Sequence, residues 1–158
     1  MAAKKAAKPN TEYLEKQAEE IRAALAPSAT QGEVFRAAAE AGYLTALADG
    51  SEDDVERAAL VSAIEVLSKG FVVGWETETF LDEAAAKVKA DGAPARFTAV
   101  GKRLAELGHA EAGLLIGATV AHASGGIDKA EAQVLEKIGA AAGVGRQEVA
   151  SIVKKARG

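Results

Sequence analysis

The densest group of carboxylates in the sequence lies in the segment DGSEDDVE, residues 49–56. Carboxylate oxygens are the ligands that hard cations such as calcium prefer. The segment is not an EF-hand, because placing Gly50 at the glycine position of that loop puts Leu47 at a ligand position. The sequence leaves open an irregular site for a weakly held divalent cation, Ca²⁺ or similar. Its candidate ligands are Asp49, Asp53, Asp54 and Glu56.

A second interpretation of the same acids is helix capping. Asp53 and Glu56 have the spacing of a capping box, in which each side chain accepts a hydrogen bond from the backbone of the other. Asp128 and Glu131 repeat this spacing, and Ile127 stands where a hydrophobic staple begins. Capping would occupy two of the four candidate ligands, so a cation there would bind with roughly millimolar affinity. We expect the second acidic segment to be mostly structural.

No group of residues in the sequence has the spacing of a known catalytic centre. The chain contains no cysteine, which excludes disulfides, thiolate nucleophiles and cysteine-bound metals. It also lacks a phosphate-binding glycine loop and a nucleophile elbow. His109 and His122 are too far apart to share a helix face, which leaves a metal triad with Glu111 or Glu131 as the alternative. We therefore expect a protein that is not an enzyme.

Two further features bear on packing or binding. Trp75 stands at a break between two expected helices, where it is either a buried anchor or a contact for a partner. Gly113, Gly117 and Ala121 recur at four-residue spacing, which places them on one face of a helix. A row of small residues allows a neighbouring helix to approach closely, and we expect this role rather than a cofactor groove.

Composition and periodicity predict an all-α fold. The 158 residues are 49% hydrophobic and 4% aromatic, and alanine is abundant. Apolar residues recur at helical spacing, and glycine or proline interrupts the pattern. We expect one compact domain of seven or eight helices over residues 11–158. The expected helices cover about residues 11–26, 31–48, 76–90, 94–107, 110–123, 128–142 and 146–156, with a further helix from residue 53. The expected core includes Leu60, Ile64, Leu67, Leu114, Leu115, Leu135 and Ile138.

An internal repeat relates the two parts of this domain. A shift of 75 residues aligns Asp53 with Asp128 and Leu60 with Leu135, and it also aligns the two glycine-containing loops. Each part then contains a helix, a loop, an acidic helix start, a long helix and a final helix. This pattern predicts two pseudo-symmetric halves, at about residues 32–90 and 94–157, that share one core.

The charge distribution bears on partners and location. The net charge is −4, but residues 1–10 form a basic tail with Lys4, Lys5 and Lys8. We expect this tail to be mobile and not to bind nucleic acid at physiological salt, while peripheral association with an anionic membrane stays open. No apolar run is long enough to span a bilayer, and no secretory signal is present, so we expect a cytoplasmic protein.

Two segments resemble elements of the TerB-like family, named for tellurite resistance. They are ALADGSEDDVERAAL (46–60) and AHASGGIDKAEAQVLEKIGAAAGV (121–144), although Glu52 and Ser124 depart from the family pattern. The resemblance implies an all-helical fold with internal pseudo-symmetry and a non-enzymatic, metal-sensing module with acids at Asp49, Asp53 and Glu56. It therefore predicts an interaction or ion-responsive module linked to metal or tellurite stress. The alternative is a structural scaffold or assembly subunit that acts through contacts with other proteins.

Overall fold

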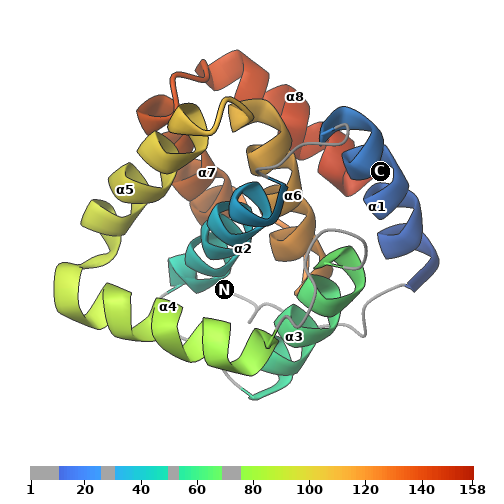
Figure 1. The fold of residues 1–158 in the computed structure, drawn as a ribbon, viewed down its shortest axis with the longest axis horizontal. Helices are drawn as coiled ribbons and strands as arrows, with labels where there is room; N and C mark the ends of the chain where they lie inside the picture. Colours follow the sequence, from blue (N-terminus) through green and yellow to red (C-terminus); the bar gives the residue numbers. More distant parts are fainter. Residues whose placement is uncertain (1–10, 26–30, 50–53, 69–75) are drawn as a thin grey trace.

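The computed structural model describes residues 11–25, 31–49, 54–68 and 76–158, and every regular element in them is a helix (Figure 1). Eight α-helices occupy these residues, and a short 3-10 helix, η1, follows the second of them. The prediction of an all-α fold with seven or eight helices is confirmed. The elements are α1 (Thr11–Leu25), α2 (Gln31–Ala46), η1 (Leu47–Asp49), α3 (Asp54–Ser68), α4 (Thr77–Asp91), α5 (Ala93–Glu106), α6 (Ala110–Ala123), α7 (Lys129–Ala141) and α8 (Arg146–Arg157).

Helices α2 and α6 pack against each other at the centre of the molecule, and the other helices surround them (Figure 1). A Cβ placed on Gly117 of α6 would stand 3.1 Å from the Cβ of Ala41 and 3.3 Å from the nitrogen of Gly42 on α2. A Cβ on Gly113 would stand only 2.4 Å from Cδ2 of Leu104 on α5. The expectation that small residues of α6 let neighbouring helices approach closely is therefore confirmed for Gly113 and Gly117.

The packing of the helices is pseudo-symmetric, with α2–α5 as one half of the molecule and α6–α8 together with α1 as the other. The symmetry pairs α1 with α5, α2 with α6, α3 with α7 and α4 with α8. When each helix is replaced by its counterpart, most pairs of packed helices become other pairs that also pack. For example, α1–α3 becomes α5–α7, α2–α4 becomes α6–α8, and α2–α7 becomes α3–α6. Gly42 and Gly117 are equivalent under the 75-residue shift, and they lie against each other. The pseudo-two-fold axis therefore passes through the crossing of α2 and α6.

The core of the described residues consists mainly of aliphatic side chains from all eight helices. Burying these side chains is the main favourable contribution to folding. The residues that the sequence placed in the core are at most 9% exposed, so this prediction is confirmed for Leu60, Ile64, Leu67, Leu114, Leu115, Leu135 and Ile138.

The connection between α4 and α5 is shorter than the sequence predicted. Only Gly92 separates the two helices, because α4 continues through Asp91. Gly92 has a φ of 88°, in the left-handed region, and its N–H donates to the carbonyl of Val88 at 2.8 Å, which ends α4. Pro94, which was expected to begin the next helix, is in the first turn of α5, where its missing N–H costs little.

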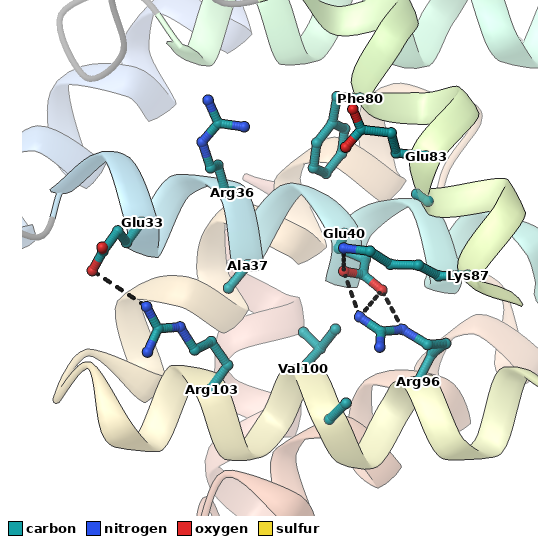
Figure 2. A pocket seen from close by; sticks show the side chains of 12 residues that line it. Glu33, Arg36, Ala37, Glu40, Phe80, Glu83, Lys87, Arg96, Val100 and Arg103 are labelled. Atoms are coloured by element: carbon teal, nitrogen blue, oxygen red, sulfur yellow. Dashed lines mark hydrogen bonds and ion pairs between the residues drawn. The ribbon is translucent and has the colours of Figure 1, made fainter. Parts of the chain in front are cut away.

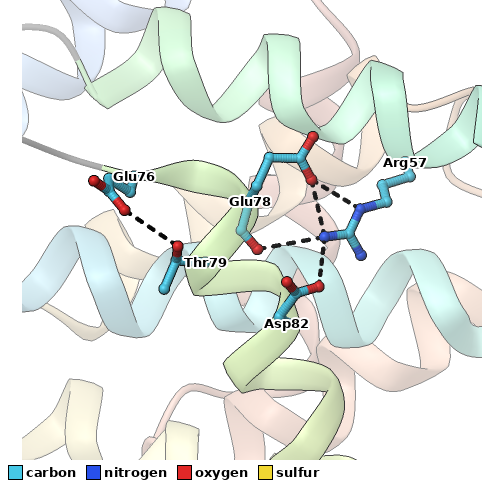
Figure 3. A network of polar contacts seen from close by, with 5 residues as sticks. All are labelled: Arg57, Glu76, Glu78, Thr79 and Asp82. Atoms are coloured by element: carbon cyan, nitrogen blue, oxygen red, sulfur yellow. Dashed lines mark hydrogen bonds and ion pairs between the residues drawn. The ribbon is translucent and has the colours of Figure 1, made fainter.

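An arginine of α3 fixes the start of α4 (Figure 3). The guanidinium of Arg57 donates from Nε to Oε1 of Glu78 at 3.0 Å and from Nη2 to Oδ1 of Asp82 at 2.8 Å. Nη2 also donates to the backbone carbonyl of Glu78 at 3.3 Å. Because both carboxylates are exposed, the ion pairs are screened by solvent, and the network mainly sets the orientation of α4 relative to α3.

Candidate functional site

A strongly charged hollow lies between α2, α4 and α5 (Figure 2). We call it the polar groove. Its volume is about 440 Å³, which is in the range of sites that hold small ligands or a few side chains of a partner. Its lining residues are Glu33, Arg36, Ala37, Glu40, Phe80, Glu83, Ala84, Lys87, Arg96, Ala99, Val100 and Arg103.

An ion pair between the buried Glu40 of α2 and the partly buried Arg96 of α5 forms one end of the polar groove. The side chain of Glu40 is 7% exposed, and that of Arg96 is 17% exposed. Arg96 donates from Nε to Oε2 of Glu40 at 2.8 Å and from Nη2 to Oε1 at 3.0 Å, so the carboxylate is held bidentately. The hydrogen bonds to Glu40 raise the pKa of Arg96, and the guanidinium therefore stays charged.

Other charges surround this pair with looser contacts. Nζ of Lys87 on α4 lies 3.9 Å from Oε1 of Glu40, and its side chain is half exposed. On α5, Nη2 of Arg103 lies 3.3 Å from Oε2 of Glu33. Four basic side chains line the groove (Arg36, Lys87, Arg96 and Arg103), together with three carboxylates (Glu33, Glu40 and Glu83). Two carboxylates outside the lining also pair with these bases: Asp91 lies 3.6 Å from Arg96, and Glu106 lies 3.7 Å from Arg103.

The floor of the polar groove is apolar. Ala37 of α2 and Val100 of α5 are buried beneath it, and Phe80 stands half-buried at its edge (Figure 2). Ala84 of α4 is also buried and lines the groove. An apolar floor with charged walls suits a segment of another protein that inserts an apolar side chain and places charged groups at the rim.

The two halves of the molecule differ at the buried ion pair. Under the 75-residue shift, Leu115 of α6 takes the place of Glu40. The buried faces of α1 and α5 correspond when Ala18 is aligned with Gly101 and Ile21 with Leu104. This alignment places Tyr13 opposite Arg96. The fold therefore accepts a leucine and a tyrosine where the polar groove has an ion pair.

Sequence reasoning did not find the polar groove. Glu40 and Arg96 are 56 residues apart, and nothing in their local sequence relates them. The one available signal was the internal repeat, because a buried-face position that is leucine in one half and glutamate in the other indicates a local difference in role.

The structure describes only part of the predicted cation site. Asp49 ends η1, Asp54 begins α3 and is exposed, and Glu56 is buried in the first turn of α3. Asp53 lies outside the described residues, as does Trp75. In the described part of the chain, no three His, Cys, Asp or Glu side chains are grouped so that they could hold a metal ion. A cation bound by Asp49, Asp53, Asp54 and Glu56 stays a prediction.

The second acidic segment forms the capping box that the sequence predicted. The backbone N–H of Glu131 donates to Oδ1 of Asp128 at 2.8 Å, and the N–H of Asp128 donates to Oε1 of Glu131 at 3.0 Å. Ile127, the residue before the cap, is buried. These contacts satisfy free donors at the start of α7, so Asp128 and Glu131 have a structural role there.

Comparison of the chain with known protein families, with curated proteins and with solved structures found no match. Among the helices that the structure describes, none has the length and apolar character needed to cross a membrane.

Proposed function

We propose that this protein is a non-catalytic module that binds a segment of another protein in the polar groove. The observation that carries the proposal is the Glu40–Arg96 pair, in which Glu40 is buried and Arg96 is partly buried at the groove in one half of a pseudo-symmetric fold. The other half has Leu115 and Tyr13 at the equivalent positions.

Energetics support a role for this pair beyond stability. Bringing two charges out of water costs about as much as their attraction returns, and apolar replacements of buried pairs are often neutral or stabilising. The equivalent positions of the second half already contain such replacements. A charge pair at the end of a groove does, however, give directional contacts that select one partner over another.

The lining of the groove indicates the chemistry of the partner segment. An apolar side chain would cover Ala37, Ala84 and Val100, and a neighbouring carboxylate would lie near Lys87 and Arg103. The half-exposed Lys87 and Arg103 at the rim favour a carboxylate of the partner, and rim charges of this kind mainly increase the rate of association.

The resemblance to TerB-like proteins supports a module of this kind, and we extend the proposal to a cytoplasmic protein of the response to metal or tellurite stress. An ion held at residues 49–56 would regulate it there. The alternative function is a structural scaffold or assembly subunit, in which the Glu40–Arg96 pair only joins α2 to α5.

A random peptide display library, selected on the purified protein, tests the proposal. We expect enrichment of peptides that combine an apolar residue with acidic neighbours. The variant Lys87→Glu/Arg103→Glu should bind the selected peptides roughly tenfold more weakly or worse, equivalent to about 1.4 kcal/mol. The matched control Lys89→Glu/Lys102→Glu reverses two exposed charges on the same helices outside the groove and should bind normally.

A second variant separates the proposed function from the scaffold alternative. Glu40→Leu/Arg96→Tyr introduces the residues of the second half, so the helices should keep their packing while peptide binding is lost. If the pair is only a structural joint, this variant should instead lower the melting temperature without a specific effect on peptides. Unchanged peptide binding in both groove variants would show that the proposal is wrong.

A further inference from the structure

A second hollow lies beside the polar groove and has a different lining. It is formed by the end of α2 with η1, the α4–α5 turn and α7, and its volume is about 430 Å³. We call it the apolar groove. Arg96 and Phe97 are neighbours on α5, but Arg96 lines the polar groove and Phe97 lines the apolar one. Its apolar lining includes Leu44, Leu47, Val88, Phe97 and Val134.

The equivalent place in the other half of the molecule contains an aromatic ring. The 75-residue shift relates Leu44 to Thr119 and Leu47 to His122. The ring centroid of Tyr13 lies 5.4 Å from that of His122, and its hydroxyl also interacts with the side chain of Thr119. Tyr13 therefore packs against the counterparts of residues that line the apolar groove.

The side of the apolar groove that α4 forms also has a counterpart, at the end of α8. The buried faces of α4 and α8 correspond when Leu81 is aligned with Val149 and Ala84 with Ile152, which places Val88 opposite Ala156. The hydroxyl of Tyr13 donates to the carbonyl of Ala156. Thr119, His122 and Ala156, three residues that Tyr13 contacts, thus all have counterparts in the apolar groove.

The counterpart of Tyr13 does not fill the apolar groove. Arg96 turns to Glu40 of α2 and forms the buried ion pair. The space that an aromatic side chain occupies in one half is thereby left open in the other, and the surrounding Leu47, Val88 and Phe97 stay partly exposed. We propose that the apolar groove binds an aromatic side chain of a partner protein.

The lining of the groove specifies phenylalanine over tyrosine. Leu44 and Leu47 replace Thr119 and His122, so the polar side chains that contact the Tyr13 hydroxyl and ring have no equivalent on α2 and η1. The carbonyl of Val88 already accepts a hydrogen bond from the N–H of Gly92 at 2.8 Å. The polar side chains of this groove, Gln133 and Lys137, belong to α7 rather than to α2 or η1. A phenol hydroxyl placed as that of Tyr13 would therefore lose its hydrogen bonds to water without the partners that Tyr13 has, whereas a phenyl ring would not.

The proposal is tested with N-acetyl-phenylalanine amide, N-acetyl-tyrosine amide and N-acetyl-alanine amide added to methyl-labelled protein and followed by NMR. We expect saturable shifts of the methyl signals of Leu44, Leu47 and Val134 with the phenylalanine amide. The tyrosine amide should bind at least about threefold more weakly, and the alanine amide should give no saturable shift. Equal or tighter binding of the tyrosine amide, or no saturable shift with phenylalanine amide, would overturn the proposal.

A filled variant locates the binding. Ala130 of α7 is exposed and lines the groove, so Ala130→Phe should place a ring in it and abolish the shifts. The matched control is Ala150→Phe, because Ala150 is exposed on α8 and lies outside the groove. Persistence of the shifts in Ala130→Phe would contradict the proposal. Lys87→Glu/Arg103→Glu, which tests the polar groove, should leave the phenylalanine shifts unchanged, so the two proposals fail independently.

Discussion

At the scale of the residue, Tyr13 joins three helices through its ring and its hydroxyl. It belongs to α1, its ring packs edge-on against His122 of α6, and its hydroxyl donates to the carbonyl of Ala156 in α8. Burial, the largest cause, raises the pKa of Tyr13 from 10.0 to about 12. The hydroxyl therefore keeps its proton, and its donated hydrogen bond, at pH values where an exposed tyrosine has lost its proton.

This shift of the Tyr13 pKa predicts a dependence of stability on pH. The pKa is higher in the folded state, so its contribution to the free energy of unfolding is complete below pH 10 and is lost as the pH rises toward 12. Urea unfolding of the parent and of Tyr13→Phe measures this directly. We expect the variant to be less stable by about 1 kcal/mol below pH 10, because it lacks the hydrogen bond to Ala156.

The difference between the two proteins should shrink between pH 10 and 12, because phenylalanine does not titrate. Lysines titrate in the same range, but they are common to both proteins and cancel in the comparison. A constant difference across this range would show that Tyr13 is not protected from ionisation.

At the scale of the element, the crossing of α2 and α6 depends on two glycines. A Cβ on Gly42 would stand 2.8 Å from both Cβ and Cγ1 of Val120 and 3.1 Å from the carbonyl oxygen of Gly117. The Cβ of Val120 and the backbone oxygen cannot rotate away, so the helices themselves would have to separate.

Gly42→Ala should therefore destabilise the protein, although alanine has the higher helix propensity. Propensity would add about 1 kcal/mol of stability, whereas overpacking typically costs 1–3 kcal/mol, and the close approach of backbone atoms places this site at the upper end. We expect a net loss of roughly 1–2 kcal/mol, measured by urea unfolding. A stability equal to or above that of the parent would mean that α2 and α6 do not pack as closely as described.

The elements were largely predictable from the sequence, but the contacts between distant elements were not. The helix starting after Asp128 was predictable because capping depends on residues three positions apart. The continuation of α4 through Asp91 was not predicted. The one-residue link to α5 depends on the positive φ of Gly92, and the sequence alone does not give that angle. The Glu40–Arg96 pair was missed because its partners come together only through the packing of α2 against α5.

At the scale of the whole molecule, the pseudo-symmetry relates a covalent turn to a noncovalent contact. In one half, Gly92 links the end of α4 to the start of α5. In the equivalent place, the last turn of α8 contacts the first two turns of α1. Tyr13 donates to the carbonyl of Ala156 there, and Nε2 of Gln17 donates to the carbonyl of Lys155 at 3.3 Å. The turn at Gly92 and the contact between α8 and α1 therefore join equivalent pairs of helix ends.

This relation predicts that the chain tolerates circular permutation at Gly92. The permuted chain would begin at Ala93, run through Gly158, continue into residues 2–10 as a linker to Thr11, and end at Gly92. We expect it to fold, because every helix keeps its neighbours and the ends to be joined are already adjacent, so closing a linker of this length costs little. Circular dichroism should give the same helix content, and urea unfolding should give a single cooperative transition.

A matched permutant opened between Gly117 and Ala118 of α6 should fail to fold, because it cuts the helix that crosses α2 at the centre of the core. If both permutants fold equally well, or if the permutant at Gly92 does not fold, then the contact between α1 and α8 is not equivalent to the turn between α4 and α5.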